Sequence, residues 1–455
     1  MADRYDVLIV GGGPAGQAAA LALDGHGLAI AVVDEQPRPG GQILRQPPGH
    51  FRVANWLPGG AYDRLKAQLA RFEGLSGVDW LGGHSVLGLL SGDDGFIVQA
   101  SGPEGLRRIE ARRVLIAAGC QDLAVPLPGW TLPGVYAAGG IQAFVKSQQI
   151  VPGDRVLLAG THPLQLLIAA QIVKAGGTVA AVLFAQSRAA MARAMMTQGA
   201  AAFANIRNLL MAAGAMSTLR RAGVPVRHGV GLQAALGEDR VTGARTSEGE
   251  IACDAIGLCY GFVPQSALPR AAGASMRVAG RAGGWAAEHD EWMRSSVPGL
   301  FVAGETTGVA GAPAAMAAGE IAGIGLAHDL GLVDRATADR QVAGPRRERS
   351  ALLRFAAMLD AVADPADHLP APSPETLACR CEDVSFAAID AAIAGGGSAN
   401  AVKLLTRCGM GPCQGRNCEP TLLRRLDAAG RHGDRGFTQR FPVRPVTIGD
   451  LADPA

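Results

Sequence analysis

The sequence predicts an α/β protein with two nucleotide-binding units of the Rossmann type, followed by a small cysteine-rich domain. Three features of the sequence predict this architecture. Residues 5–23 contain a strand, a glycine-rich turn and a helix, residues 155–174 repeat that order, and four closely spaced cysteines lie within residues 379–413. A length of 455 residues is enough for about three domains.

The first unit carries the full pattern of a dinucleotide site. The apolar run at residues 5–10 predicts a buried parallel strand, which leads into the sequence Gly-Gly-Gly-Pro-Ala-Gly at residues 11–16. Gly11 allows a tight turn, Gly13 lets the backbone approach a pyrophosphate, and Gly16 lets the next helix pack close to the strand. The free N–H groups at the start of that helix then face the phosphates.

An acidic pair follows the second strand at the distance that a ribose contact requires. The strand at residues 28–33 ends in Asp34 and Glu35. A carboxylate at this point favours an unphosphorylated adenosine ribose, as in FAD or NAD, over NADP. Asp34 closes the strand more directly, but the spacing admits either acid.

The second unit departs from the pattern at its turn. Residues 155–159 predict a strand, residues 160–164 a turn, and residues 165–174 a helix. His162 lies where a dinucleotide turn carries glycine, and its side chain crowds any pyrophosphate. We therefore expect a retained scaffold without a nicotinamide nucleotide. The alternative is that His162 contacts the phosphate of a bare nucleotide.

Four cysteines near the C-terminus predict a metal centre. One residue separates Cys379 from Cys381, and a Gly-Met-Gly-Pro turn separates Cys408 from Cys413. Four thiolates on two loops suit an iron–sulfur cluster or a structural zinc ion. Zinc pairs usually have roughly two to four residues between their cysteines, so the first pair favours the cluster. We interpret Cys418, the fifth cysteine, as a buried or spare thiol.

Composition and charge limit the remaining possibilities. A net charge of +2 gives no support for nucleic-acid binding. No apolar run reaches the roughly 18 residues of a transmembrane helix, and the N-terminus enters a strand without a signal peptide. Clustered cysteines fit a reducing compartment. We therefore expect a cytoplasmic protein, and peripheral contact with the inner membrane stays open.

The cysteine segment resembles the 2Fe–2S domain of bacterioferritin-associated ferredoxin. Residues 379–384, Cys-Arg-Cys-Glu-Asp-Val, and residues 402–416, which include Thr-Arg-Cys-Gly-Met-Gly-Pro-Cys-Gln-Gly-Arg, carry this resemblance. It implies a small helical iron–sulfur domain. The ligands that it implies are Cys379, Cys381, Cys408 and Cys413.

The two nucleotide-binding units resemble the flavoproteins of the glutathione and thioredoxin reductase-like superfamily. The segments at residues 39–43, 113–119, 126–129 and 298–305 carry this resemblance, which implies bound FAD. The sequence lacks that superfamily's redox-active cysteine pair after Gly41 and in the second unit, so electrons must leave the flavin by another route. Glu305 replaces the usual aspartate at the ribityl chain. The implied cofactor residues are Gly11, Gly13, Pro14, Ala15, Gly16, Asp34, Glu35, Gly40, Gly41, Gln42, Ala118, Gly119, Gly304 and Glu305.

Along nearly its whole length the chain resembles the alpha (A) subunits of bacterial heteromeric FAD-dependent amine dehydrogenases. That group includes opine, octopine and nopaline oxidases, hydroxyproline and proline dehydrogenases, and hydrogen cyanide synthase. The resemblance implies an electron-transfer subunit whose flavoprotein beta partner oxidises an opine, imino acid or related secondary amine. It leaves open a third subunit, small and ferredoxin-like, and an FMN at an interface between subunits. No catalytic residue is expected in this chain.

The resemblance and the composition together predict domain boundaries. The tail is expected to be extended and free to cross another domain or subunit. Two alternatives to the electron-transfer function remain. One is a stand-alone NAD(P)H-dependent FAD/2Fe–2S reductase, against which His162 argues, and the other is a structural or redox-sensing subunit. The expected parts are an FAD-binding domain at 1–118 and 290–335, a second nucleotide-binding-like domain at 135–289, a linker at 336–374, a 2Fe–2S domain at 375–430 and a tail at 431–455.

Overall fold

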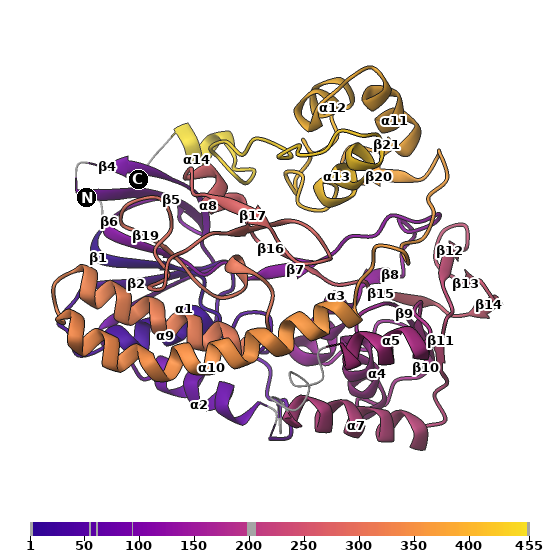
Figure 1. Ribbon diagram of the computed structural model, residues 1–455, viewed down its shortest axis with the longest axis horizontal. Helices are drawn as coiled ribbons and strands as arrows, with labels where there is room; N and C mark the ends of the chain where they lie inside the picture. Colours follow the sequence, from indigo (N-terminus) through magenta and orange to yellow (C-terminus); the bar gives the residue numbers. More distant parts are fainter. Residues whose placement is uncertain (1–2, 54–55, 61, 93, 198–205, 453–455) are drawn as a thin grey trace.

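The computed structural model describes residues 3–53, 56–60, 62–92, 94–197 and 206–452. Within these residues the chain forms two α/β units, one long helix that lies along both, and a small helical domain near the C-terminus (Figure 1). The predicted α/β class is confirmed, and so is the arrangement as two nucleotide-binding-like units.

The first unit is built on a seven-stranded sheet in the order β3-β2-β1-β6-β5-β4, with β19 also paired to β6. The β1, β2, β3, β6 and β19 pairings are parallel, whereas β4, β5 and β6 pair antiparallel. The carboxyl ends of β1, β2 and β19 therefore meet at one edge, where α/β sheets bind ligands. The strands are β1 (Asp3–Val10), β2 (Ile30–Asp34), β3 (Val78–Gly82), β4 (Ser85–Gly92), β5 (Gly95–Gly102), β6 (Gly105–Ile116) and β19 (Leu300–Val302).

Three helices cover one face of this sheet: α1 (Pro14–Leu23), α2 (Asp63–Glu73) and α9 (Ala312–Asp329). Helices α1 and α9 are in close contact because glycines of α9 face the backbone of α1. A side chain at Gly319 would collide with the carbonyl oxygen of Ala15. This close packing fixes the middle of α9 beside the N-terminus of α1.

The second unit contains a five-stranded parallel sheet in the order β11-β10-β9-β15-β8. Its strands are β8 (Val135–Ala137), β9 (Val156–Gly160), β10 (Val179–Phe184), β11 (Val226–His228) and β15 (Ala255–Cys259). Its helices are α3 (Ala138–Ala143), the π-helix η1 (Phe144–Gln148), α4 (Leu164–Lys174), α5 (Arg188–Met196) and α7 (Ile206–Arg221). An antiparallel sheet of β12 (Leu232–Leu236), β13 (Gly243–Thr246) and β14 (Gly249–Ala252) flanks it.

Short antiparallel pairs connect the two units. β7 (Cys120–Asp122) leaves the first unit and pairs with β16 (Phe262–Pro264), which returns from the second unit. Between β16 and β19 lie α8 (Ala267–Ala271) and the pair β17 (Met276–Val278) and β18 (Trp285–Ala287). The short 3₁₀ helix η2 (Gly304–Thr307) then follows β19.

The 28-residue helix α10 (Arg335–Val362) occupies most of the predicted linker. Asp334 caps it, because its carboxylate accepts a hydrogen bond from the N–H of Thr337 at 2.7 Å. Figure 1 shows α10 running along α9 and on to the second unit. The segment predicted as a linker, 336–374, is thus helical as far as Val362, and residues 363–374 contain no helix or strand.

The C-terminal domain packs three short helices and one small strand pair around a core that includes Cys379, Cys408 and Cys418, with Cys381 packed against it. Ser385 and Ser398 cap the first two helices through their hydroxyl oxygens. The elements are β20 (Leu377–Cys379), β21 (Val384–Ser385), α11 (Phe386–Ala394), α12 (Ala399–Thr406) and α13 (Glu419–Ala428).

After α13 the chain crosses to the first unit. Residues 431–447 contain no helix or strand, and the N–H of Val443 donates to the carbonyl of Leu87 at 2.8 Å. Arg444 forms an ion pair with Glu35. The tail is thus extended across another domain until α14 (Ile448–Ala452), a short helix that the sequence analysis did not predict.

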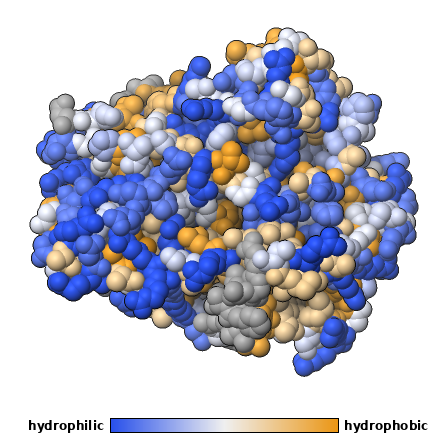
Figure 2. Space-filling model, in the orientation of Figure 1, coloured by the Kyte–Doolittle hydropathy of each residue, from blue (hydrophilic) through white to orange (hydrophobic). Residues whose placement is uncertain are grey.

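The surface is mixed in character. Figure 2 shows mainly hydrophilic residues over one face, with smaller apolar areas between them. Within the described residues, every helix is too short or too polar to cross a membrane.

Candidate cofactor sites

The glycine turn of the first unit has the geometry of an anion site. Gly13 is the N-cap of α1, Pro14 takes the first helical position, and no side chain caps the first N–H groups. Gly11 has a φ of 110°, and a side chain there would collide with the carbonyl of Ala117. A side chain at Gly16 would collide with the carbonyl of Gly11. The turn therefore requires glycine at both positions.

The loop at residues 40–45 lies against this turn. The N–H of Gly40 donates to the carbonyl of Gly12 at 2.9 Å. A Cβ atom at Gly13 would meet only the Cα of Gly41, at 3.7 Å. Gly13 is thus open on the side where a ligand would approach. Gln42, in the same loop, is exposed.

The structure separates the roles of the two acids after β2. The Asp34 carboxylate accepts hydrogen bonds from the N–H of Gly12 and the N–H of Gln36, both at 2.7 Å. Burial raises the pKa of Asp34, and these two hydrogen bonds oppose the rise. Glu35 instead pairs with Arg444 of the tail. Asp34 is therefore the acid that lies at the glycine turn.

Glu305 approaches the same region from β19. Gly304 brings the chain close to α1, because a Cβ atom there would lie 2.8 Å from the Cβ of Ala15. The Cys120 thiol donates to Glu305 Oε2 at 2.8 Å, and the N–H of Gly311 donates to Glu305 Oε1 at 3.2 Å. Burial raises the pKa of Glu305. Burial and the nearby carboxylate hold the pKa of Cys120 well above its usual value, so this thiol is the donor.

Cys120 is a functional candidate that the sequence analysis missed. It directly follows Ala118 and Gly119, both of which carry the resemblance to flavoproteins. Gly119 accepts a hydrogen bond at its carbonyl from the N–H of Gln265 at 2.9 Å. The position of Cys120 directly after Gly119 was the available signal for a role at this site. Its hydrogen-bond partner, Glu305, is distant in the sequence.

The residues around the turn fit a ligand rich in hydrogen-bond acceptors. Among the described residues, Arg45 Nε and Thr306 Oγ1 are buried without a partner. Arg45 belongs to the loop that contacts the glycine turn, and Thr306 follows Glu305. Phosphate and flavin oxygens would satisfy such donors. The predicted residues from Gly11 to Gly16, with Asp34, Gly40, Gly41, Gly304 and Glu305, converge here.

Lys146 is a second candidate that the sequence analysis missed. It is buried on the π-helix η1, and its Nζ lies 3.3 Å from the carbonyl of Ile43 and 5.7 Å from the ring centre of Tyr62. Burial lowers the pKa of Lys146 to about 7. π-Helical turns are frequent at functional sites. Lys146 thus brings an amino group with a lowered pKa from the second unit to the loop of the first.

The corresponding turn of the second unit presents a neutral ring. The Nδ1 atom of His162 accepts a hydrogen bond from the N–H of Leu164 at 3.2 Å, and the ring meets Phe262 edge-on. Burial lowers the pKa of His162 to about 4, so the ring is uncharged at neutral pH. It offers no positive charge to a phosphate.

The C-terminal end of α10 covers this second turn. The hydroxyl of Thr161 donates to the carbonyl of Ala363 at 2.6 Å. The amide of Gln186 donates to the carbonyls of Val362 at 2.8 Å and Thr161 at 2.9 Å. A helix C-terminus carries partial negative charge, which repels an anion. A neutral histidine and a helix end at this turn are both consistent with the prediction that it holds no nicotinamide nucleotide.

The C-terminal domain brings all five cysteines into two neighbouring groups. The Sγ atoms of Cys379, Cys408 and Cys418 lie within 4.8 Å of one another. Hydrogen bonds from Cys408 and Cys418 hold the pKa of the Cys379 thiol far below its usual value. Burial raises the pKa of Cys381, and Cys413 is among the groups that contact it. Cys418 is buried, which agrees with its interpretation as a buried or spare thiol, and its sulfur lies among the predicted ligands.

Glycines let the two cysteine loops approach each other. A side chain at Gly411 would collide with the Cβ of Cys381, and side chains at Gly409 and Gly415 would collide with the ring of Phe437. The loops are therefore compact around the sulfurs. Soft thiolate donors of this kind suit an iron–sulfur cluster or a zinc ion.

Comparison with known proteins gives matches along the whole chain. The profile of the pyridine nucleotide-disulphide oxidoreductase family matches residues 5–319. In Rhizobium meliloti (strain 1021), the opine oxidase A subunit is 35% identical over 474 residues, which cover 99% of this chain and 98% of that protein. Hydrogen cyanide synthase subunit HcnB of Pseudomonas protegens is 32% identical and covers 96% of each chain.

Solved structures support the fold. The L-proline dehydrogenase structure from P. horikoshii aligns with a TM-score of 0.70 and 20% identity, covering 100% of this chain and 81% of that chain. A thioredoxin reductase from T. acidophilum aligns with a TM-score of 0.52 and 19% identity, covering 72% and 99%. The first alignment extends over the whole chain, including the cysteine domain, whereas the second leaves part of the chain uncovered.

Proposed function

The chain belongs to the pyridine nucleotide-disulphide oxidoreductase family and groups with the opine oxidase A and HcnB subunits, and on this premise we propose an electron-transfer function. It is the flavoprotein and iron–sulfur subunit of a multi-subunit dehydrogenase that acts on CH–NH bonds. The substrate is an opine, an imino acid or a related secondary amine. Full-length similarity to subunits of amine-oxidising enzymes supports this proposal.

The observation that carries the proposal is the convergence of the glycine turn, an acid and unpaired buried donors at one sheet edge. The N–H groups of Ala15 and Gly16 bind the pyrophosphate of FAD. Asp34 binds the adenosine ribose, and Glu305 binds the ribityl chain. When bound, FAD supplies a carrier that takes up two electrons and can release them singly.

The cysteine domain holds a 2Fe–2S cluster, a one-electron carrier. The resemblance assigns Cys379, Cys381, Cys408 and Cys413 as ligands. Because Cys418 lies within the same group of sulfurs as Cys408, it competes for that place. Loss of iron in the Cys408→Ser variant, with iron retained in Cys418→Ser, would support the assigned ligands. The reverse result would exchange the roles of the two cysteines.

Substrate oxidation takes place in a partner chain. The relatives are named as subunits, which supports a heteromer with a flavoprotein beta subunit that carries the substrate site. A third subunit, small and ferredoxin-like, and an FMN at the contact between subunits complete this proposal. Clustered thiols require a reducing compartment, so we place the complex in the cytoplasm.

The rival NAD(P)H-dependent reductase is not favoured. His162 is neutral, and the Thr161 hydroxyl and the Gln186 amide at the second turn already donate to the carbonyls of Ala363 and Val362. The test adds NADH or NADPH to the anaerobic chain, and in parallel adds the amine together with the partner subunit. We expect flavin bleaching only with the amine and partner. Rapid bleaching by NADH alone would favour the reductase instead.

A further inference from the structure

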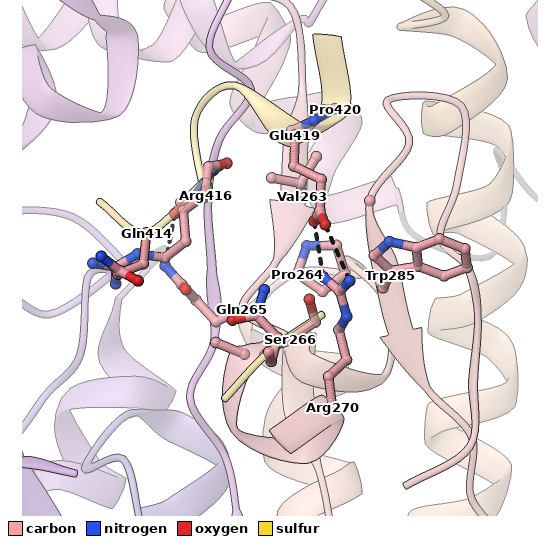
Figure 3. Close-up of a pocket in the computed structure, with 14 residues that line it drawn as sticks. Val263, Pro264, Gln265, Ser266, Arg270, Trp285, Gln414, Arg416, Glu419 and Pro420 are labelled. Atoms are coloured by element: carbon pink, nitrogen blue, oxygen red, sulfur yellow. Dashed lines mark hydrogen bonds and ion pairs between the residues drawn. The ribbon is translucent and has the colours of Figure 1, made fainter. Parts of the chain in front are cut away.

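The cysteine domain meets the α/β body around a cavity of about 30 Å³. Figure 3 shows this cavity between the two parts, with Glu419 and Arg416 entering from the cysteine domain. Gln265 and Arg270 line it from the body. The polar contacts around this cavity hold the cysteine domain against the body.

On one side of the cavity, a buried ion pair clamps the two parts together. Arg270 Nη1 lies 2.8 Å from Glu419 Oε2, and Nη2 lies 3.0 Å from Oε1 (Figure 3). The two side chains are 11% and 10% exposed. Arg270 Nη2 also donates to the carbonyl of Phe437 at 2.6 Å. Such a bidentate, buried pair sets orientation as well as contact.

On the other side, a hydrogen-bonded bridge leads to the cysteine loop. The Gln121 amide donates to the carbonyl of Arg416 at 2.8 Å. The Gln265 amide donates to Gln121 Oε1 at 2.9 Å and so orients it. Arg416 Nε donates to the carbonyl of Cys413 at 2.9 Å. Gln121 is covalently next to Cys120, whose thiol donates to Glu305.

These contacts form one continuous connection from Glu305 to Cys413. It passes through the Cys120 thiol, the peptide to Gln121, the Gln121 amide and Arg416. Separate contacts hold the domain elsewhere: the Trp130 indole donates to the carbonyl of Leu377 at 2.8 Å, and Arg424 donates to the carbonyl of Ala282. The domain is therefore docked at several points, and a freely swinging arm is disfavoured.

We propose that Gln121 and Arg416 are positioning residues that hold the Cys413 loop beside Glu305, so that electrons cross between flavin and cluster at this joint. This inference rests on the proposed function and adds a place for the transfer. In each transfer, the reduced flavin loses one electron and the cluster gains one. Arg416 has a second effect, because its positive charge beside the Cys413 loop stabilises the electron that the cluster receives.

The test uses the anaerobic full-length chain with flavin and iron quantified. Light with EDTA, a tertiary amine electron donor, reduces the flavin, and absorption and EPR follow reduction of the cluster. We expect slower cluster reduction in Gln121→Leu and Arg416→Met at unchanged flavin and iron content. The matched control is Arg424→Met, which removes a domain contact outside the connection and should keep the wild-type rate. Equal rates in all four proteins would overturn the proposal.

A redox titration separates positioning from a purely structural role. Arg416→Met should shift the midpoint potential of the cluster downward, whereas Arg416→Lys, which keeps the charge, should restore it. Gln121→Leu, a neutral change outside the cysteine domain, should leave the potential unchanged and still slow the transfer. An unshifted potential in Arg416→Met would overturn the assigned role of Arg416.

The outcomes also separate this inference from the proposed function. A wild-type chain without flavin or without iron contradicts the proposed function itself. A wild-type chain that holds both, with variants that transfer electrons at the wild-type rate, contradicts only the joint. If Arg416→Met lowers iron content, Gln121→Leu and Arg416→Lys still decide the question.

Discussion

The two nucleotide-binding-like units both begin with a strand, a turn and a helix, but different helix ends lie at their turns. The N-terminus of α1 lies at the first turn, and the C-terminal end of α10 covers the second. In the first unit, the turn at Gly13 leaves the N–H groups of α1 uncapped. In the second, His162 Nδ1 accepts the N–H of Leu164 at the start of α4, and the last carbonyls of α10 accept the donors of Thr161 and Gln186. We therefore expect a phosphate site at the first turn and not at the second, because anions bind where a helix N-terminus keeps free N–H groups.

The largest expected effect on flavin binding comes from a side chain placed at Gly13 in the turn of the first unit. A Cβ atom at Gly13 meets no protein atom closer than 3.7 Å, so Gly13→Val should fold but occupy the space of the pyrophosphate. Loss of about two charged hydrogen bonds weakens flavin binding on the order of a hundredfold or more. Flavin released on denaturation measures occupancy. The control is Gly214→Ala, which has open space around it, and full occupancy of Gly13→Val would contradict the assignment.

The two acids after β2 should differ in effect. Asp34→Asn keeps an acceptor for the N–H of Gly12 but loses the charge, so flavin affinity should fall roughly tenfold. Glu35→Gln breaks only the ion pair with Arg444, which is partly exposed and contributes about 0–1 kcal/mol to stability. Titration of the apoprotein with FAD compares the two variants. A larger loss of affinity in Glu35→Gln would exchange the roles of the acids.

Lys146 offers a pH test of the contact between the units. Because burial lowers its pKa to about 7, the unfolded chain carries a proton between that pH and about 10.4 that the folded chain lacks. Stability therefore rises with pH across this window, by up to about 1.4 kcal/mol per unit, and the full penalty applies below it.

Lys146→Met should remove this rise and gain most over the wild type at low pH. Urea unfolding at several pH values across the window measures the difference. The exposed Lys174, mutated to Met, is the matched control. Parallel stability curves for the wild type and Lys146→Met would show that Lys146 stays solvated in the folded chain.

The smallest expected effect comes from a substitution in the turn of the second unit, measured as the response of the flavin to NADH. His162→Gly restores the glycine that a dinucleotide turn carries but leaves the carbonyls of Val362 and Ala363 in place. NADH should therefore still fail to bleach the flavin in this variant, as in the wild type. A response to NADH in His162→Gly would show that the histidine alone closes the turn, and that the end of α10 moves aside.

Local patterns allowed the first turn and the cysteine loops to be predicted, because their chemistry lies within a few adjacent residues. Contacts between distant segments did not show in the sequence. Two hydrogen bonds, from Cys120 to Glu305 and from Thr161 to the carbonyl of Ala363, join residues that are far apart in the chain. The helix α10 was hidden by Gly344 and Pro345, which usually interrupt helices. Packing along α9 and α5 stabilises it despite these residues.

The cysteine domain shows the same division between local and distant information. The spacing of Cys379 and Cys381 predicted a metal site, but it could not rank the five thiols. Cys418 lies at the start of α13, and only the packing of that helix brings its sulfur to Cys379 and Cys408. Tertiary structure therefore decides which sulfurs are close enough to share a cluster.

The most direct test of the central claim examines the cofactors of the anaerobically purified full chain. Flavin, iron and zinc are quantified, and absorption and EPR spectra are recorded before and after dithionite. The account predicts flavin together with about two irons per chain and a 2Fe–2S signal on reduction. One zinc without iron would make the cysteine domain structural and contradict the electron-transfer function.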